Sequence, residues 1–217
     1  MKLNKIKSYV LFCSCLFSLN LYSEPFFCII TGAPGTGKTT LIKALSKKDC
    51  ETIPEAATAL ILEYGKEYTR EIGREEFQRQ IWRKQIADEA KLKLRITDAI
   101  AFIDRGIPDG ICYFLYDKLE VPKKLITETK NAKKRTKIVF LLDHLPEKLF
   151  TNTSIRRSTP ERAAELHKLL KQTYKKYGYN VVEVPFFEDD PEGKTGPEQR
   201  ADFVLEEIEK FKAESSS

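Results

Sequence analysis

The chain has 217 residues, of which 32% are charged and 11% aromatic, and its net charge is +5. This composition is ordinary for a soluble globular protein with one domain, and it excludes low-complexity and collagen-like classes. The first 23 residues hold three lysines and no acidic residue, so the remainder has 34 basic against 32 acidic residues. A balance of +2 is too small to indicate nucleic-acid binding, and we expect no nucleic-acid partner.

Residues 1–23 have the pattern of an export signal. Three lysines precede the apolar run Tyr9–Phe17, and Leu21-Tyr22-Ser23 offers a candidate cleavage site. Polar residues interrupt the apolar stretch, which argues against a membrane span. We therefore interpret 1–23 as a signal peptide or N-terminal anchor, through which the protein could associate with a membrane. The alternative is a simple N-terminal extension or a misplaced start codon.

The cysteines give little support to export. Beyond residue 23 the chain has only Cys28, Cys50 and Cys112, an odd number, two of them on apolar stretches. This does not form a disulfide framework, and buried thiols are the favoured interpretation.

A phosphate-binding loop follows the first apolar run after the leader. The residues fit G-x-x-x-x-G-K-[ST] at every fixed position, and they lie between a strand-like and a helix-like stretch. Glycines let the backbone N–H groups converge on phosphate oxygens, and the helix N-terminus adds a positive dipole end. Lys38 supplies a charge for the outer phosphates, and the Thr39 hydroxyl can ligate Mg²⁺. The predicted nucleotide-binding residues here are Gly32, Ala33, Pro34, Gly35, Thr36, Gly37, Lys38, Thr39 and Thr40.

Five strand-like runs alternate with helical stretches. Such alternation predicts an α/β fold with a parallel sheet, right-handed crossovers and helices on both faces. A long helix is expected between the second and third runs, at about residues 74–97, because apolar residues recur there at helical spacing. The runs are Phe26–Ile30, Glu51–Pro54, Ala99–Ile103, Lys137–Leu142 and Asn180–Val184.

Charged residues follow these strands at the edge where the phosphate loop lies, which is where parallel sheets bind ligands. Asp104 ends an apolar strand and is a candidate Mg²⁺ ligand and catalytic residue. Glu55 is a candidate base for a substrate hydroxyl, and Arg105 is a candidate phosphate ligand. The structural alternatives are a turn cap for Asp104 and the acidic first turn of a helix for Glu55.

An arginine-rich segment follows the fourth strand, at residues 151–162. Ser158 or Thr159 can cap a helix opened by Pro160. A mobile arginine-bearing lid would stabilise a γ-phosphoryl group in transfer and exclude water, and we select Arg157 as its catalytic arginine ahead of Arg156 and Arg162. The alternative is a solvated basic loop.

Several segments together resemble one family. The chain is similar to the P-loop AAA-type domains shared by the ribosylnicotinamide kinase region of NadR and the animal translocation-defect proteins. The similarity covers nearly all of residues 25–211. The segments, in order, are TGAPGTGKTTLIKAL, IPEAA, FIDRG, PDGICYFLY, VFLLD, IRRSTPERA, YKKYGYNVVEVP and GPEQRADFVLEEI.

The resemblance implies a three-layer P-loop NTPase fold like that of nucleoside and nucleotide kinases, with strand order 2-3-1-4-5. It implies that Glu55 is the general base and that Asp104 and Arg105 are the metal and phosphate pair. Arg200 matches a late arginine of the family, near the adenine or structural. Gln85 would touch the acceptor or lie at the surface, and Tyr113 and Tyr116 would line the acceptor pocket. Thr58 stands where many relatives have arginine, which leaves the acceptor open.

Two functions from different classes follow. The first is a kinase that uses Mg²⁺ and ATP, or GTP, to phosphorylate a nucleoside-like hydroxyl acceptor. The second is a nucleotide-binding switch with slow hydrolysis, associated with a membrane or lipid. The expected domain spans 24–212, followed by a frayed tail at 213–217. The compartment stays open, because the leader indicates export or anchoring whereas the nucleotide site indicates access to cytoplasmic triphosphates.

Overall fold

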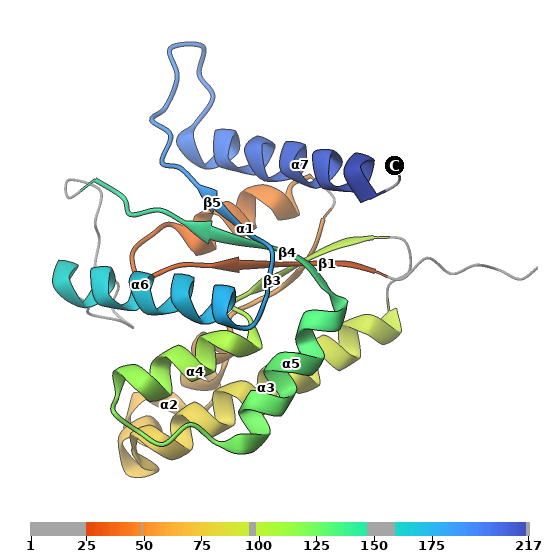
Figure 1. Ribbon diagram of the computed structural model, residues 1–217. Helices are drawn as coiled ribbons and strands as arrows, with labels where there is room; N and C mark the ends of the chain where they lie inside the picture. Colours follow the sequence, from red (N-terminus) through yellow and green to blue (C-terminus); the bar gives the residue numbers. More distant parts are fainter. Residues whose placement is uncertain (1–24, 49, 96–98, 147–158, 216–217) are drawn as a thin grey trace, which may run out of the picture.

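The computed structural model describes residues 25–48, 50–95, 99–146 and 159–215. These residues form an α/β fold in which helices cover both faces of one sheet (Figure 1). The elements are β1 (Phe26–Thr31), α1 (Lys38–Ser46), β2 (Glu51–Ile53), α2 (Ala56–Glu71), α3 (Gly73–Arg95), β3 (Ile100–Asp104), α4 (Ile107–Tyr116), α5 (Lys123–Arg135), β4 (Thr136–Leu142), α6 (Pro160–Lys176), β5 (Val181–Val184) and α7 (Gly196–Ser215).

The sheet is parallel, with strand order β2-β3-β1-β4-β5, which confirms the expected topology. Its central strand, β1, pairs with β3 and β4, and Ile30 lies opposite Asp104 in this register. The carboxyl ends of β1 and β3 are therefore neighbours. This places the loop after β1 beside the residues that follow β3.

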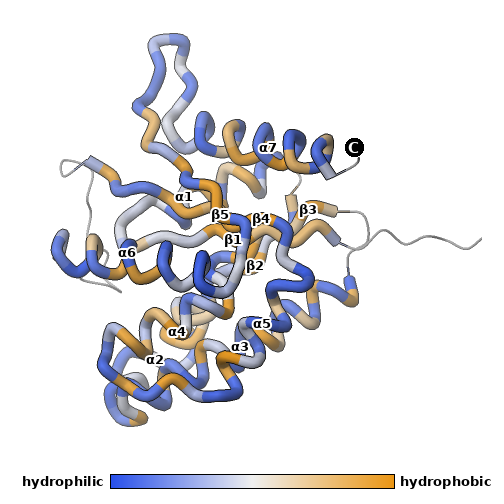
Figure 2. The backbone as a smooth tube through the Cα atoms, in the orientation of Figure 1, coloured by the Kyte–Doolittle hydropathy of each residue, from blue (hydrophilic) through white to orange (hydrophobic). Residues whose placement is uncertain are grey.

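The two faces of the sheet have separate cores. On one face α1 and α7 pack over a cluster that includes Ile30, Leu41 and Val204. On the other face Leu92 of α3 and Leu170 of α6 pack against β1, β3 and β4. Figure 2 shows the strands as the most continuously hydrophobic part of the chain, as expected where both faces are covered.

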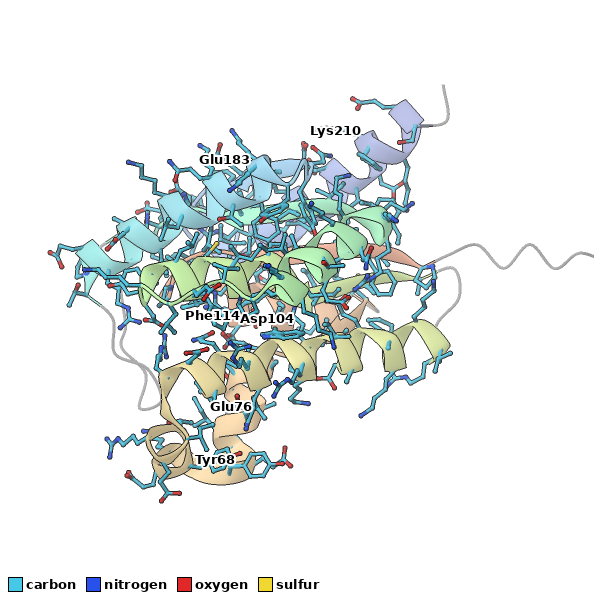
Figure 3. The ribbon with its side chains drawn as sticks, turned by 60° about the horizontal axis from the view of Figure 1, so that its bottom comes forward. Tyr68, Glu76, Asp104, Phe114, Glu183 and Lys210 are labelled. Atoms are coloured by element: carbon cyan, nitrogen blue, oxygen red, sulfur yellow. The ribbon has the colours of Figure 1, made fainter. Side chains whose placement is uncertain are left out.

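Helices α2 and α3 form a pair that projects from the sheet. Figure 3 shows Tyr68 and Glu76 near the outer end of this pair, far from Asp104 at the sheet. Gly65 interrupts α2 with φ 84°, a left-handed conformation that favours glycine, and the helix bends there. Helix α4 packs between this pair and α6, and α5 packs against α4.

The sequence analysis made a prediction for each end of the chain, and the structure bears only on the C-terminal one. Residues 213–215, expected to be a frayed tail, instead continue α7, where the Ser215 hydroxyl donates to the Phe211 carbonyl at 2.8 Å and Lys212 pairs with Glu209. The proposed signal peptide or anchor at 1–23 lies outside the described residues. Within the parts of the chain that the structure describes, no helix is both long and apolar enough to span a membrane.

Candidate functional site

The phosphate loop connects β1 to α1, as the motif predicts. Gly37 precedes α1 with φ 84°, a conformation that places the following N–H groups at the open end of the helix. Lys38 is buried, and its Nζ donates to the carbonyls of Gly32 at 2.8 Å and Ala33 at 2.7 Å. The amine of Lys38 thus lies over the concave face of the loop, where the motif places phosphate oxygens.

Arg200 of α7 supports the loop from behind. Its Nη1 donates to the Thr36 carbonyl at 2.7 Å, and its Nε donates to the Pro185 carbonyl at 2.9 Å. The side chain is buried, and its guanidinium lies 5.7 Å from the centre of the Phe186 ring. These contacts match the structural alternative for this arginine, because it joins the loop after β5 to the phosphate loop.

Asp104 and Arg105 lie at the carboxyl end of β3. Asp104 is buried as the last residue of that strand. Arg105 adopts φ 70°, which is uncommon for a residue other than glycine, and its N–H donates to the Ile30 carbonyl at 2.9 Å. This turn directs Arg105 back toward the phosphate loop, where its Nη1 donates to the Gly32 carbonyl at 3.3 Å.

Glu55 meets Arg105 across the site. The carboxylate precedes α2 and accepts a hydrogen bond from Arg105 Nε through Oε1. Its other oxygen accepts from the Thr58 hydroxyl at 2.8 Å, so Thr58 helps to orient the candidate base. The structure therefore brings together Lys38, Glu55 and Arg105, three residues predicted from separate parts of the sequence.

A buried network behind Arg105 was not predicted. Asp109 of α4 accepts hydrogen bonds from Arg105 Nη1 at 3.2 Å, from the Thr31 hydroxyl at 2.9 Å and from the Tyr174 hydroxyl at 2.6 Å. Gly106 leaves the space for this contact, because a Cβ there would lie 2.4 Å from the Tyr174 oxygen. The sequence does carry one signal for this network. Asp109 is a carboxylate four residues after Arg105, in an otherwise apolar stretch.

Two groups of this network, Arg105 and Tyr174, have pKa values raised by their surroundings. Burial alone would lower the pKa of Arg105, but Tyr113 and the carboxylates of Glu55, Asp109 and Asp104 outweigh it and raise the pKa well above its ordinary value. Burial, reinforced by the charge of Asp109, raises the pKa of Tyr174 in the same direction. The guanidinium therefore stays charged, and the tyrosine hydroxyl stays a hydrogen-bond donor.

A cavity of about 570 Å³ adjoins this cluster and lies among α2, α3 and α4. Pro34 of the phosphate loop, Glu55, Arg105 and Asp109 bound one part of it. Its apolar lining is Ala57, Ile61, Phe77, Ile81, Trp82, Gly110 and Tyr113, and its remaining lining residues are Thr69, Arg70, Gly73, Arg74, Gln78, Gln85 and Arg162.

The residues expected in an acceptor pocket divide into two groups. Tyr113 and Gln85 line the cavity. Gln85 is 5% exposed, which excludes a surface position, and its Nε2 donates to the Arg105 carbonyl. Tyr116 is not part of the lining, and its ring instead lies 4.9 Å from the guanidinium carbon of Arg162.

The predicted lid is described only in part. Arg157 lies outside the described residues, as does Ser158. Thr159 caps α6, where its hydroxyl accepts from the Arg162 N–H at 3.3 Å, and Pro160 opens the helix. Arg162 of this first turn lines the cavity together with Pro34, so the start of α6 brings a cation to the boundary between loop and cavity.

The residues predicted to hold Mg²⁺ fit that ion. Thr39 is exposed in the first turn of α1, and Asp104 ends the neighbouring strand. A hydroxyl and a carboxylate are oxygen ligands of the kind that Mg²⁺ takes. Among the described residues, no group of three or more His, Cys, Asp or Glu side chains forms a metal site by itself.

Solved structures with the same fold include several kinases. A NadR protein in complex with NR is 17% identical, with a TM-score of 0.58, and the match covers 84% of this chain and 49% of that one. The present chain therefore corresponds to about half of NadR. A deoxyadenosine kinase from M. mycoides is 16% identical over 85% of this chain and 100% of that one, with a TM-score of 0.56.

A thymidylate kinase from Ehrlichia chaffeensis is also similar, with 15% identity, a TM-score of 0.53, and coverage of 86% of this chain and 99% of that one. At these identities the likeness shows the fold alone, and no curated protein matches the chain. The family model described as AAA domain matches residues 27–192, which confirms the resemblance predicted from the sequence. The chain belongs to this AAA domain family and has the P-loop fold of nucleoside and nucleotide kinases.

Proposed function

We propose that the protein is a small-molecule kinase, which transfers the γ-phosphoryl group of ATP or GTP to a hydroxyl of a nucleoside-like acceptor. The observation that carries this proposal is the shared boundary between loop and cavity. Pro34 of the phosphate loop lines the same cavity as Glu55 and Arg105. An acceptor in this cavity would lie next to the outer phosphate of a nucleotide held by the loop.

The chemistry assigns one role to each residue. Glu55 takes the proton of the acceptor hydroxyl while the acceptor oxygen bonds to the γ-phosphorus and the bond from that phosphorus to the bridging oxygen breaks. The nucleoside diphosphate leaves with the electrons of the broken bond. Glu55 already accepts hydrogen bonds from Arg105 and Thr58, which hold the carboxylate toward the site.

The cations of the site stabilise the charge that develops on the phosphoryl oxygens. Lys38 and Arg105 both contact the Gly32 carbonyl, so they converge on one point of the phosphate loop. Arg162 is a third cation at the boundary, and we propose that Arg157 joins it when nucleotide is bound. Thr39 and Asp104 are the residues that would hold Mg²⁺, which when bound neutralises phosphate charge.

The support from similar structures comes from the ligands with which they were solved. NadR was solved with NR and with NAD and AMP-PNP, and the M. mycoides deoxyadenosine kinase was solved with dCMP and dCDP and with dATP. Proteins with this fold therefore bind nucleosides and nucleotides. The cavity described here has the size and mixed lining that such a ligand requires.

The test uses the full chain with Mg²⁺ and ATP or GTP, and a panel of nucleosides, nicotinamide riboside and nucleoside monophosphates. Products are identified by mass spectrometry, with Lys38→Ala as the control. We expect a phosphorylated product from at least one acceptor and none with the variant. Tight nucleotide binding without any product would instead favour the nucleotide-dependent switch.

A further inference from the structure

The backbone turn that carries Arg105 is held from the side of α3. Arg105 adopts φ 70°, and its N–H donates to the Ile30 carbonyl at 2.9 Å. Its own carbonyl accepts a hydrogen bond from Nε2 of Gln85, a buried residue of α3. A left-handed conformation is costly for arginine and persists only where the surrounding structure fixes it. Gln85 is therefore one of the contacts that keep the Arg105 backbone, and with it the guanidinium, in place.

Glu89 lies one helical turn after Gln85 on the same face of α3. Its side chain is 4% exposed, and its Oε1 accepts from Gln85 Nε2 at 3.4 Å. Its Oε2 accepts from Arg135, the last residue of α5, through Nε at 3.2 Å and Nη2 at 2.5 Å. The carboxylate of Glu89 thus connects the end of α5 to the amide that holds the Arg105 turn.

These contacts decide which end of the Gln85 amide faces Arg105. A carboxamide has one nitrogen with two donor hydrogens and one oxygen that only accepts. The Arg105 carbonyl and the ionised Glu89 carboxylate are both acceptors without a hydrogen to donate, so the amide must turn its nitrogen to them. A neutral side chain at position 89 that could donate would also satisfy the amide oxygen. The amide could then flip, and its oxygen would face the Arg105 carbonyl and repel it.

The charge of Glu89 is maintained against its burial. Burial raises the pKa of Glu89, while the charge and hydrogen bonds of Arg135 and the hydrogen bond from Gln85 oppose that rise. Tyr179 is also close, but its hydroxyl donates to the Thr129 carbonyl at 2.7 Å. An apolar pair could pack α3 against α5 as well as this ion pair does. What an apolar pair could not supply is a fixed acceptor for the Gln85 amide.

From these observations we propose that Glu89, held by Arg135, is a positioning residue for the proposed phosphoryl transfer. Glu89 fixes the orientation of Gln85, and Gln85 fixes the turn that directs the Arg105 guanidinium to Glu55. Glu89 does not line the cavity, so it acts through these residues and not on the acceptor itself. This inference rests on the proposed function, because Arg105 is one of the cations at the point of transfer.

Glu89→Gln tests the proposal, because it keeps the shape of the side chain, removes its charge and adds a donor. The full chain is assayed with Mg²⁺, ATP and the preferred acceptor. We expect kcat to fall by about 10- to 100-fold because the Arg105 guanidinium is displaced. The KM for ATP should stay within about twofold of the parent value, since the phosphate loop is untouched. The matched control is Asp88→Asn, which removes the neighbouring acid of α3, a partner of Lys84 at 2.8 Å, and should react like the parent protein.

A second variant guards against loss of the fold, because Glu89→Gln leaves Arg135 without its carboxylate partner. Glu89→Met combined with Arg135→Met replaces the ion pair by apolar side chains and should melt near the parent protein, yet show a similar loss of kcat. Gln85→Leu should lower kcat as well, and adding Glu89→Gln to it should lower kcat no further, since Glu89 acts through Gln85. An unchanged kcat in both Glu89 variants, or losses that multiply in the combined variant, would overturn the proposal.

Hydrogen exchange of the backbone amides in residues 103–109 separates this inference from the proposed function. It is measured on the full chain without ligand. We expect faster exchange in both Glu89 variants than in the parent protein and Asp88→Asn, because the Arg105 turn opens more often. That result would support the inference even if no acceptor were phosphorylated, in which case the kinase proposal alone would fail. Exchange that is unchanged in both Glu89 variants would refute the inference and leave the kinase proposal intact.

Discussion

The proposed nucleotide side and the proposed acceptor side of this site are built differently. The nucleotide side is one contiguous loop, Gly32–Thr39, whose ligands are backbone groups and one lysine. The acceptor side collects side chains from four helices and two strand ends, and Glu55, Arg105 and Asp109 bound the part of it next to the phosphate loop. Backbone ligands demand glycines at fixed spacing, whereas a side-chain cavity tolerates many sequences. One side is therefore general for phosphates, and the other can diverge with the acceptor.

The largest effect is expected from Lys38→Ala, which removes the charge on the nucleotide side. We expect turnover to fall by about a thousandfold, because the outer phosphates lose their nearest fixed cation. Thermal stability should change little. Steady-state kinetics and a melting curve check both points.

The matched control is Lys43→Ala on the exposed face of α1. It should react like the parent protein. Similar losses in both variants would mean that the charge of Lys38 has no particular role.

Glu55→Gln tests whether the acceptor side performs chemistry or only binds. The amide cannot accept the hydroxyl proton, so we expect kcat to fall by about a hundredfold with a small change in KM for ATP. Steady-state rates with the preferred acceptor measure kcat and the KM for ATP separately. Glu71→Gln, at the exposed end of α2, is the control. A kcat within about twofold of the parent value would show that another group takes the proton.

Much of the nucleotide side could be predicted from the sequence, because its residues are local. The glycine spacing, the strand before it and the helix after it are all visible within residues 26–46. The five strands could also be located, to within one residue at most ends, from their apolar runs. The strand order came from the resemblance, since short apolar runs alone do not specify their neighbours.

The acceptor side could be predicted only where a residue directly follows a strand. Glu55 and Arg105 are such residues. Asp109 lies inside a helix, and its role depends on partners such as Tyr174, which is 65 residues away. Helical spacing identifies the buried face of a helix but does not tell which residue of another element its polar side chains contact. That information exists only after the helices have packed.

Tyr174→Phe tests whether the network behind Arg105 connects the two sides. Loss of its hydrogen bond leaves Asp109 with fewer donors, and we expect a several-fold fall in kcat and a stability loss of about 1 kcal/mol. The KM for ATP should stay unchanged, since the phosphate loop is untouched. Tyr177→Phe, at the C-cap of the same helix, is the control. Equal kcat values for the two variants would show that Tyr174 acts only in packing.

The smallest effect concerns His167, on α6 outside both sides of the site. Burial, with the nearby His144 ring at 4.7 Å, lowers the pKa of His167 below its ordinary value of 6.5, against the opposing charges of Asp143 and Glu183. The unfolded chain then binds more protons below about pH 6.5, so stability falls as the pH decreases through that value and is unaffected above it.

His167→Asn should therefore lose less stability than the parent protein between about pH 7.5 and about pH 5.5. Urea unfolding at the two pH values measures the difference. An equal loss in the parent protein and the variant would show that other groups cause the acid sensitivity.

The measurement that tests the central claim most directly follows the γ-phosphate itself. The full chain is incubated with Mg²⁺, γ-labelled ATP or GTP and the preferred acceptor, and the label is divided between acceptor and inorganic phosphate. We predict that the label passes mainly to the acceptor and that Glu55→Gln slows this transfer by about a hundredfold. Release of the label only as inorganic phosphate, at a rate that neither the acceptor nor Glu55→Gln changes, would contradict a kinase and indicate a slow nucleotide hydrolase.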